Sequence, residues 1–206
     1  MATNNAPALR RETPLTPVAD KQGHEIMICD PEWFDEKKTY QIASAPVRTA
    51  LLEFSGSDLN FMARVLYAEA SGSAQLADKK ERDKEKAAIM NVNHFRLNRK
   101  GYPSNRYVAK NFREVCEAPG QFESVFAGTP KFSKSEPGSA LNLKKSECAD
   151  LGESIDAIKA FMAGGPAAQY QFDNFRGYNP SGQGTHIGRS RFWLSETGRL
   201  LLEKTP

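Results

Sequence analysis

The most regular hydrophobic pattern in the chain lies between residues 57 and 70. Apolar side chains recur there every three or four residues, which is the spacing of one face of an α-helix. Ser57 or Asp58 can cap the start of this segment, and Gly72 can end it. The pattern therefore predicts a central, largely buried helix over Ser57–Ala70.

Three further segments predict helices. The run ADKKERDKEK leads into AAIMNVNHFRL, which indicates a second helix whose charged first turns face solvent. The segment SECADLGESIDAIKAFMAG places Leu151, Ile155 and Ile158 on one face and stops at a Gly-Gly pair. The stretch YVAKNFREVCEAPG predicts a short helix before a Pro-Gly turn. The next segment, GQFESVFAGTPKFSKSEPGSALN, has the composition of a loop.

Strand patterns occur near both ends of the chain. A short β-like run covers Glu25–Cys29 and is stopped by Pro31, and aromatic and polar residues alternate around glycine turns in QYQFDNFRGYNPSGQGTHIGRSRFWLS. The fold class is therefore α+β and mostly helical, with a small β region near the C-terminus. We expect one domain over residues 51–206, preceded by an N-terminal extension over residues 1–50 that is flexible up to about residue 22.

Composition and charge limit the classes of protein to which this chain can belong. Apolar residues make up 39% and charged residues 26%, and no run approaches the ~18 apolar residues of a membrane-spanning helix. The net charge of +3 is too small for a nucleic-acid-binding face, although it suits an anionic polymer. No secretory signal is visible at the start, which predicts synthesis in the cytoplasm. His24, His94 and His186 lack metal-site spacing, so neither a metal nor another cofactor is expected.

The three cysteines, Cys29, Cys116 and Cys148, match no zinc or redox motif. The first interpretation is that they are buried or idle thiols of a protein made in the cytoplasm. The alternative is one disulfide, Cys116–Cys148, in an oxidising compartment.

Glu69 is the residue with the clearest potential for chemistry. It follows Met62 by seven residues and Leu66 by three, which places its carboxylate on the same helix face as the core side chains. Loss of hydration on that face favours the protonated acid. A protonated acid is what cleavage of a glycosidic bond requires, because the leaving oxygen must gain a proton. The alternative is a residue at a frayed helix end, exposed or paired with an arginine.

Five short motifs, read in order, resemble those of the spore-cortex-lytic (SleB-like) cell-wall hydrolases. They are DLNFMARVLYAEA-SG, AAIMNVNH, YP, GQFESVFAG and YNPSGQGTHIGRSRFW, and together they cover about residues 58–194. The resemblance implies a lysozyme-like or lytic-transglycosylase-like fold. It also implies cleavage between N-acetylmuramic acid and N-acetylglucosamine, with Glu69 as the single catalytic acid/base. A lytic transglycosylase needs no protein nucleophile, since the muramic acid 6-hydroxyl displaces the leaving sugar.

The chain departs from the family pattern at three places. The segment between Glu69 and the second helix is longer, His94 stands where an arginine is usual, and Glu123 stands where a serine is common, followed by Ser124. These departures leave the acid in place and bear on the geometry of the site and its substrate preference.

The predicted substrate-binding residues are Gln121, Phe122, Tyr178, Asn179, Asn93 and His186. Gln121 and Phe122 combine an amide that can bond a sugar with a ring that can stack on one. Tyr178 and Asn179 belong to an aromatic and amide stretch that can line a glycan groove. Asn93 matches the family's asparagine, and His186 lies in a glycine-rich loop. The structural alternatives are a turn with a core phenylalanine, a plain β core, and a loop histidine without a ligand.

These observations together predict a peptidoglycan hydrolase, either a muramidase or a lytic transglycosylase, that acts as a monomer on glycan strands. It would act in the periplasm or cell wall after export by a non-Sec route, as an antibacterial effector delivered into a target cell or as a phage lysin. An effector would imply an immunity protein that plugs the groove. One alternative is a non-catalytic wall-binding or interaction protein on the same scaffold. Another is an amidase using Cys116 and His186, although nothing in the sequence orients this pair.

Overall fold

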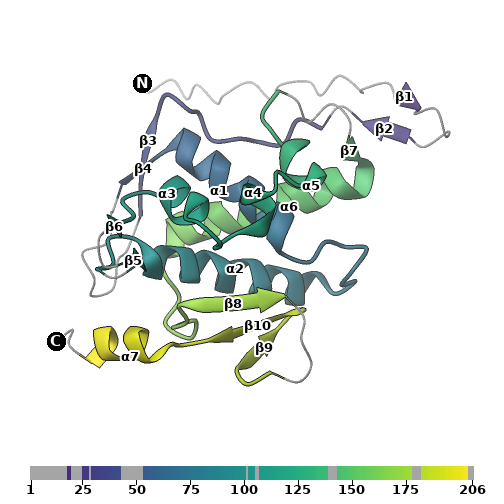
Figure 1. The fold of residues 1–206 in the computed structure, drawn as a ribbon. Helices are drawn as coiled ribbons and strands as arrows, with labels where there is room; N and C mark the ends of the chain where they lie inside the picture. Colours follow the sequence, from purple (N-terminus) through teal and green to yellow (C-terminus); the bar gives the residue numbers. More distant parts are fainter. Residues whose placement is uncertain are drawn as a thin grey trace, which may run out of the picture.

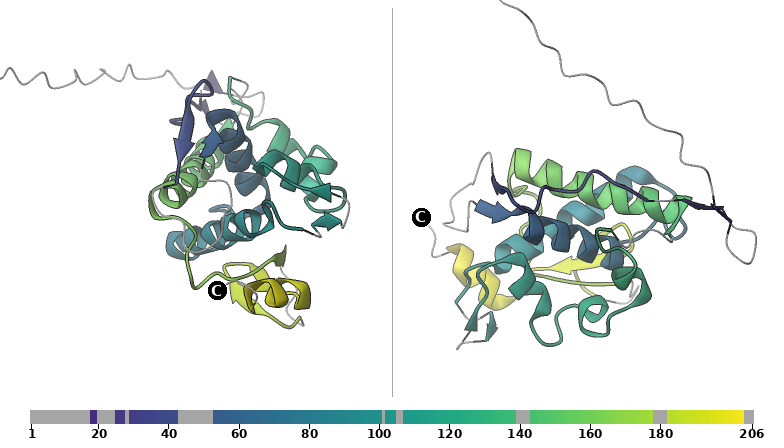
Figure 2. Two further views of the ribbon diagram at one scale, coloured as in Figure 1. Left: turned by 90° about the vertical axis from the view of Figure 1, so that its left-hand side faces the viewer. Right: turned by 90° about the horizontal axis from the view of Figure 1, so that it is seen from above.

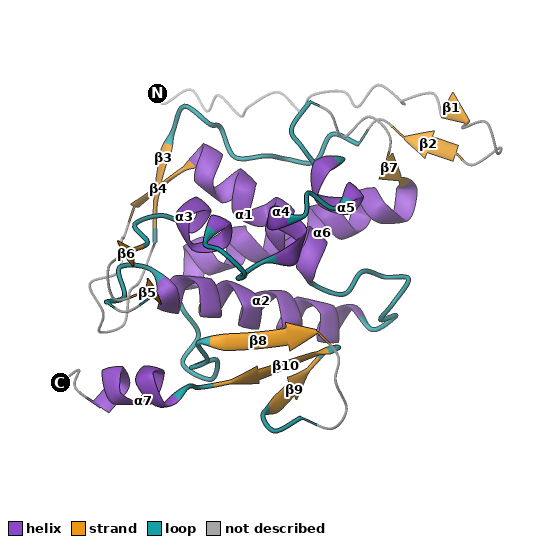
Figure 3. Ribbon diagram, viewed as in Figure 1, coloured by secondary structure: helices purple, strands orange, loops and turns teal. Residues whose placement is uncertain are grey.

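Helices form the centre of the protein, and small groups of strands lie at its edges (Figures 1 and 3). The computed structural model describes residues 18–19, 25–27, 29–42, 53–100, 102–104, 107–138, 143–177 and 182–203. The helices are α1 (Gly56–Glu69), α2 (Lys79–Arg96), α3 (Phe112–Glu117), α4 (Glu123–Phe126), α5 (Pro130–Ser133), α6 (Lys145–Gly164) and α7 (Glu196–Glu203). The strands are β1 (Val18–Ala19), β2 (Glu25–Met27), β3 (Thr39–Gln41), β4 (Glu53–Ser55), β5 (Pro103–Ser104), β6 (Tyr107–Val108), β7 (Leu143–Lys144), β8 (Asn174–Gly177), β9 (Thr185–Ile187) and β10 (Ser190–Trp193). The α+β class is confirmed, with a small strand region in the C-terminal half.

Helix α1 is the central, largely buried helix that the hydrophobic spacing predicts. Its N-cap is Ser55, whose hydroxyl accepts from the N–H of Asp58, so the helix begins slightly earlier than expected. Gly56 permits this start, because a Cβ atom there would lie 2.1 Å from the carbonyl oxygen of Asp35. The helix packs against α3, α5 and α6, and every residue from Asp58 to Tyr67 is buried.

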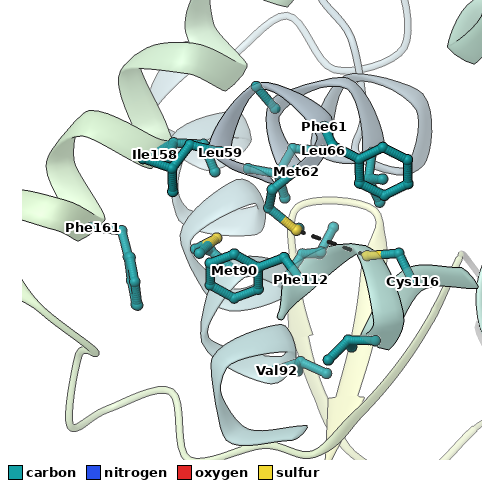
Figure 4. Packing of buried hydrophobic residues seen from close by; sticks show 14 of the residues in the cluster. Leu59, Phe61, Met62, Leu66, Met90, Val92, Phe112, Cys116, Ile158 and Phe161 are labelled. Atoms are coloured by element: carbon teal, nitrogen blue, oxygen red, sulfur yellow. Dashed lines mark hydrogen bonds between the residues drawn. The ribbon is translucent and has the colours of Figure 1, made fainter. Parts of the chain in front are cut away.

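The hydrophobic core surrounds α1 (Figure 4). Met62 and Leu66 have no exposed surface, and they belong to one cluster with Met90 of α2 and Phe112 of α3. Burial of one such large apolar side chain contributes roughly 1.5–3 kcal/mol to folding. Helix α1 is therefore a firmly packed support for Glu69 at its C-terminal end.

Helix α2 departs from the prediction that its charged first turns face solvent. The prediction is wrong for Arg82, Glu85 and Lys86, which are 6%, 1% and 1% exposed. Arg82 and Lys86 are buried where α2 packs against α6, and Glu153 pairs with them at 2.6 and 3.2 Å. Glu85 is instead buried against Ser71 and Ser190, which donate hydrogen bonds to it. A charged side chain tolerates burial when it is paired or hydrogen-bonded in this way.

The prediction for α6 is confirmed, whereas the predictions for the two segments that precede it need correction. Helix α6 buries Leu151, Ile155 and Ile158 along one face and ends at Gly165, whose φ of 71° suits glycine. The helix predicted over YVAKNFREVCEAPG is confirmed only in its second half, because Tyr107–Val108 form β6 and α3 begins at Phe112 after its N-cap Asn111. The loop prediction for the next segment is wrong in part, because it contains the one-turn helices α4 and α5.

The predicted C-terminal β region is a three-stranded antiparallel sheet in the order β8-β10-β9. Phe192 of β10 is fully buried and lies opposite Phe175 of β8, with ring centroids 5.8 Å apart. The sheet lies on the side of α2 that faces away from α1 (Figures 1 and 2). Helix α7 follows the sheet and is not foreseen by the sequence pattern.

The arrangement of the cysteines agrees only in part with the two interpretations drawn from the sequence, three thiols or a Cys116–Cys148 disulfide. Cys29 is bonded to Cys148 across 119 residues, whereas Cys116 is a buried free thiol. The predicted disulfide Cys116–Cys148 is therefore wrong. The Cys116 sulfur lies 3.9 Å from the Met62 sulfur instead (Figure 4). Disulfide pairing depends on distance in space, which spacing along the chain does not report.

Part of the N-terminal extension packs on the helical core. The backbone of Phe34 and the side-chain amide of Asn60 exchange two hydrogen bonds of 2.9 Å. The flexible arm expected up to residue 22 falls outside the described residues, apart from Val18–Ala19, which form β1 and pair with β2. In the segments that the structure describes, no helix is long and apolar enough to cross a membrane.

Candidate functional site

Glu69 is the last residue of α1, and its side chain is half-buried. One of its carboxylate oxygens, Oε1, accepts a hydrogen bond of 3.2 Å from the backbone N–H of Ser124 in α4. This contact joins two of the motifs singled out in the sequence, AEA-SG and GQFES. Because the donor is a backbone N–H, it orients the Glu69 carboxylate without the entropy cost of ordering a second long side chain as the donor.

Ser124 is a site residue that the sequence reasoning did not select. The residue is 5% exposed, and its hydroxyl oxygen is buried without a hydrogen-bond partner among the described groups. Buried hydroxyls normally have a partner, so this hydroxyl is an exception among the described groups, in the residue whose N–H bonds Glu69. The available signal was its position directly after the GQFE segment.

The backbone that follows Glu69 is held from two directions. The Lys131 ammonium donates to the carbonyl oxygen of Ala70 at 3.3 Å and lies 4.6 Å from the centre of the Tyr67 ring. Burial lowers the pKa of Lys131 from its ordinary value, while nearby carboxylates, including those of Asp150 and Glu69, oppose this shift. Lys131 therefore places a positive charge beside the end of α1.

The same loop is held by Asp150 of α6. Both oxygens of this carboxylate accept from the N–H of Ser73, at 2.9 and 3.0 Å. Residue 72 must be a glycine, because a Cβ atom there would lie 2.4 Å from Asp150 Oδ2. The prediction that Gly72 ends the helix is wrong, because α1 ends at Glu69 and its C-cap is Ala70. Gly72 instead permits a close approach between the loop and α6.

Gln121 belongs to the same segment as Ser124 and is half-buried. Its Oε1 accepts from the hydroxyl of Tyr102 at 3.1 Å, and its Nε2 donates to the carbonyl of Pro119 at 3.4 Å. Burial raises the pKa of Tyr102 to about 12, so this phenol stays a hydrogen-bond donor at neutral pH. Gln121 lies three residues before Ser124, whose N–H bonds Glu69, but its own side chain bonds Tyr102 and Pro119.

Phe122 is a core residue, which was the structural alternative. It is 1% exposed, its ring centroid lies 5.7 Å from that of Phe175, and the Arg96 guanidinium lies 5.9 Å from its ring. A ring enclosed in this way offers no free face on which a sugar can stack. Its role is to anchor α4 against the C-terminal sheet, which positions Ser124 beside Glu69.

The other predicted binding residues are not gathered around Glu69. Asn93 is fully buried, donates to the carbonyl of Ile89 at 2.9 Å and accepts from the Cys116 thiol at 3.5 Å. His186 is exposed on β9, opposite Arg191. The remaining two, Tyr178 and Asn179, lie outside the described residues.

The Cys116 and His186 pair considered for an amidase is not assembled. Cys116 is buried in the core, and burial raises the pKa of its thiol well above the ordinary value. A buried thiol of this kind is a poor nucleophile. Within the described segments, no group of three or more His, Cys, Asp or Glu side chains has the arrangement of a metal site.

Two surface clefts lie away from Glu69. One of about 480 Å³ lies between α2, α6 and the segment after α6, with Asn91, Asp156 and Tyr170 in its wall. The other, of about 240 Å³, includes Asp58 and Arg113. Glu69 lines neither of them.

Comparison with known proteins gives no further support for a family. No protein-family model, curated protein or solved structure matches this chain. The resemblance to spore-cortex-lytic hydrolases thus depends on the short motifs in the sequence.

Proposed function

We propose that this protein cleaves peptidoglycan glycan strands in a lysozyme-like domain, with Glu69 as the catalytic acid and base. The main support is the position of Glu69 at the end of the buried helix α1, with its carboxylate held by the Ser124 amide at 3.2 Å. The choice of substrate rests on the sequence motifs that resemble those of the hydrolases. The choice of acid rests on the half-buried carboxylate at the end of a well-packed helix.

One carboxylic acid is sufficient for this reaction. Protonated Glu69 gives its proton to the oxygen that links N-acetylmuramic acid to N-acetylglucosamine as that bond breaks. The resulting carboxylate then takes a proton either from the muramic acid 6-hydroxyl, which closes an anhydro ring, or from a water molecule that adds to the sugar. The Ser124 N–H holds the Glu69 carboxyl group in both stages.

We further infer that the protein acts on the wall outside the reducing cytoplasm. The Cys29–Cys148 disulfide supports this inference, because disulfides persist in oxidising compartments such as the periplasm. An antibacterial effector, which an immunity protein would inhibit, and a phage lysin both remain within the proposal.

The test is the Glu69→Gln variant with purified peptidoglycan as substrate. Glutamine retains an acceptor for the Ser124 amide but cannot supply a proton, so activity should fall about 10²–10⁴-fold while the melting temperature changes little. Glu123→Gln is the matched control, since Glu123 is an exposed carboxylate on the neighbouring helix α4 and should retain full activity.

Mass spectrometry of the products distinguishes the possible reactions. Anhydro-muropeptides indicate a transglycosylase, and new reducing ends indicate a hydrolase. Free stem peptides would indicate an amidase and would contradict the proposal. Near wild-type activity in Glu69→Gln would show that Glu69 is a structural residue.

A further inference from the structure

Glu85 of α2 is a buried carboxylate that connects two distant parts of the chain. It is 1% exposed, and its Oε2 accepts from the N–H of Ser71, two residues after Glu69, at 2.9 Å. Its Oε1 accepts from the hydroxyl of Ser190 at 2.6 Å and from the N–H of Arg189 at 3.2 Å. One side chain therefore bonds both the loop after Glu69 and the turn between β9 and β10.

A second contact joins the same two segments. The Arg189 guanidinium donates to the carbonyl of Gln75 at 3.3 Å. The turn lies directly on Glu85, because a Cβ atom at Gly188 would lie 2.9 Å from its side chain, and Gly188 has a φ of 60°. The loop after Glu69 and the β9–β10 turn thus form one connected structure, although more than a hundred residues separate them along the chain.

The environment of Glu85 makes these hydrogen bonds important. Among the described residues no ion pair joins Glu85 to a cation, so three hydrogen-bond donors stabilise its buried negative charge. A buried carboxylate without a counter-ion is costly unless such donors are present, and bonds to a charged acceptor are stronger than neutral ones. Displacement of either segment would remove hydrogen bonds from the buried Glu85 carboxylate. The loop after Glu69 and the β9–β10 turn are therefore held in one relative position.

We propose that Glu85 is a positioning residue for Glu69. It fixes the loop that follows Glu69 onto the β9–β10 turn, and it thereby makes the C-terminal sheet part of the framework of the active site. The catalytic part of this proposal rests on the proposed function, whereas the connection between the two segments can be tested without it.

The test compares Glu85→Gln with the wild-type protein. Glutamine has the same shape, but it places an amide N–H₂ against donors on one side, so one segment loses its partner. We expect kcat to fall by about 10–100-fold, with KM changing by less than about threefold, because a small misplacement of a catalytic group lowers the rate of the chemical step. Amide hydrogen exchange at Ser71 and Arg189 should accelerate by about tenfold or more.

Two further variants separate positioning from general destabilisation. Asp173→Asn is the matched control, because Asp173 is also a buried carboxylate, bonded to Ser195 and Arg99 at the opposite end of strands β8 and β10 from Ser190. It should lower stability and leave kcat within about twofold of the wild type. Ser190→Ala removes one donor to Glu85 and should lower kcat in the same direction by a smaller factor. It serves as the test if Glu85→Gln does not fold.

The outcomes distinguish this inference from the proposed function. Unchanged kcat and unchanged Ser71 exchange in Glu85→Gln, with Glu69→Gln inactive, would overturn the inference and leave the function standing. An equal fall in kcat for Asp173→Asn would also overturn it. If the wild-type protein cleaves no glycan, the proposed function fails. The exchange rates at Ser71 and Arg189 then decide whether Glu85 connects the two segments.

Discussion

Removal of the negative charge at Glu153 should destabilise the protein by leaving two buried cations without a counter-ion. The Glu153 carboxylate accepts from Arg82 at 3.0 and 2.6 Å and from Lys86 at 3.2 Å. Burial by itself would raise the pKa of Glu153, but hydrogen bonds from Arg82 and Lys86 hold it below the ordinary value. The ion pairs are therefore present at neutral pH.

The magnitude follows from the burial of the partners. Breaking a buried pair by removing one partner costs about 3–5 kcal/mol, and the 12% exposure of the Glu153 side chain favours the low end, about 3 kcal/mol. For a protein of this size, 1 kcal/mol corresponds to roughly 2–4 °C in melting temperature. Glu153→Gln should therefore lower the melting temperature by about 6–12 °C, as measured by circular dichroism at pH 7.

The control is Lys86→Met, which leaves the Arg82–Glu153 pair intact and fills the same space. In this variant Glu153 keeps Arg82 as its partner, so no buried charge is left without a counter-ion, and the melting temperature should fall less than in Glu153→Gln. The lowered folded pKa of Glu153 contributes stability that is present above its unfolded pKa and is lost as pH falls through the folded pKa, so the effect of Glu153→Gln should shrink in acid. A Glu153→Gln protein that melts within about 2 °C of the wild type, which corresponds to at most about 1 kcal/mol, would refute this reasoning.

Two other predictions concern pH and redox state. Burial lowers the pKa of His94 to about 4 from 6.5, so its contribution to stability is complete above about pH 6.5 and is lost as pH falls toward 4. The melting temperature of His94→Leu should therefore fall less than that of the wild type between pH 7 and 4.5, and equal slopes would contradict this. Reduction of Cys29–Cys148, which closes a loop across 119 residues, should lower stability by about 2–5 kcal/mol. The Cys116→Ala control should respond to reductant like the wild type, and a melting temperature insensitive to reductant would count against the disulfide.

The sequence by itself determined the main helices. The spacing of Met62 and Leu66, and of Leu151 and Ile158, reports which face of each helix is apolar, and a Gly-Gly pair marks where α6 ends. These are local properties, because helix periodicity and backbone freedom depend on neighbouring residues only. For the same reason the sequence placed Glu69 correctly at the C-terminal end of a buried helix.

Only the tertiary structure decided how the polar residues are used. The charges of Arg82 and Lys86 are buried because Glu153 lies opposite them, about seventy residues away in the chain. Phe122 packs in the core against Phe175 of the C-terminal sheet, so the residue of this segment that bonds Glu69 is Ser124. Burial of a charge, enclosure of a ring and pairing of cysteines all require a partner from a distant segment, and a periodic pattern contains no information about that partner.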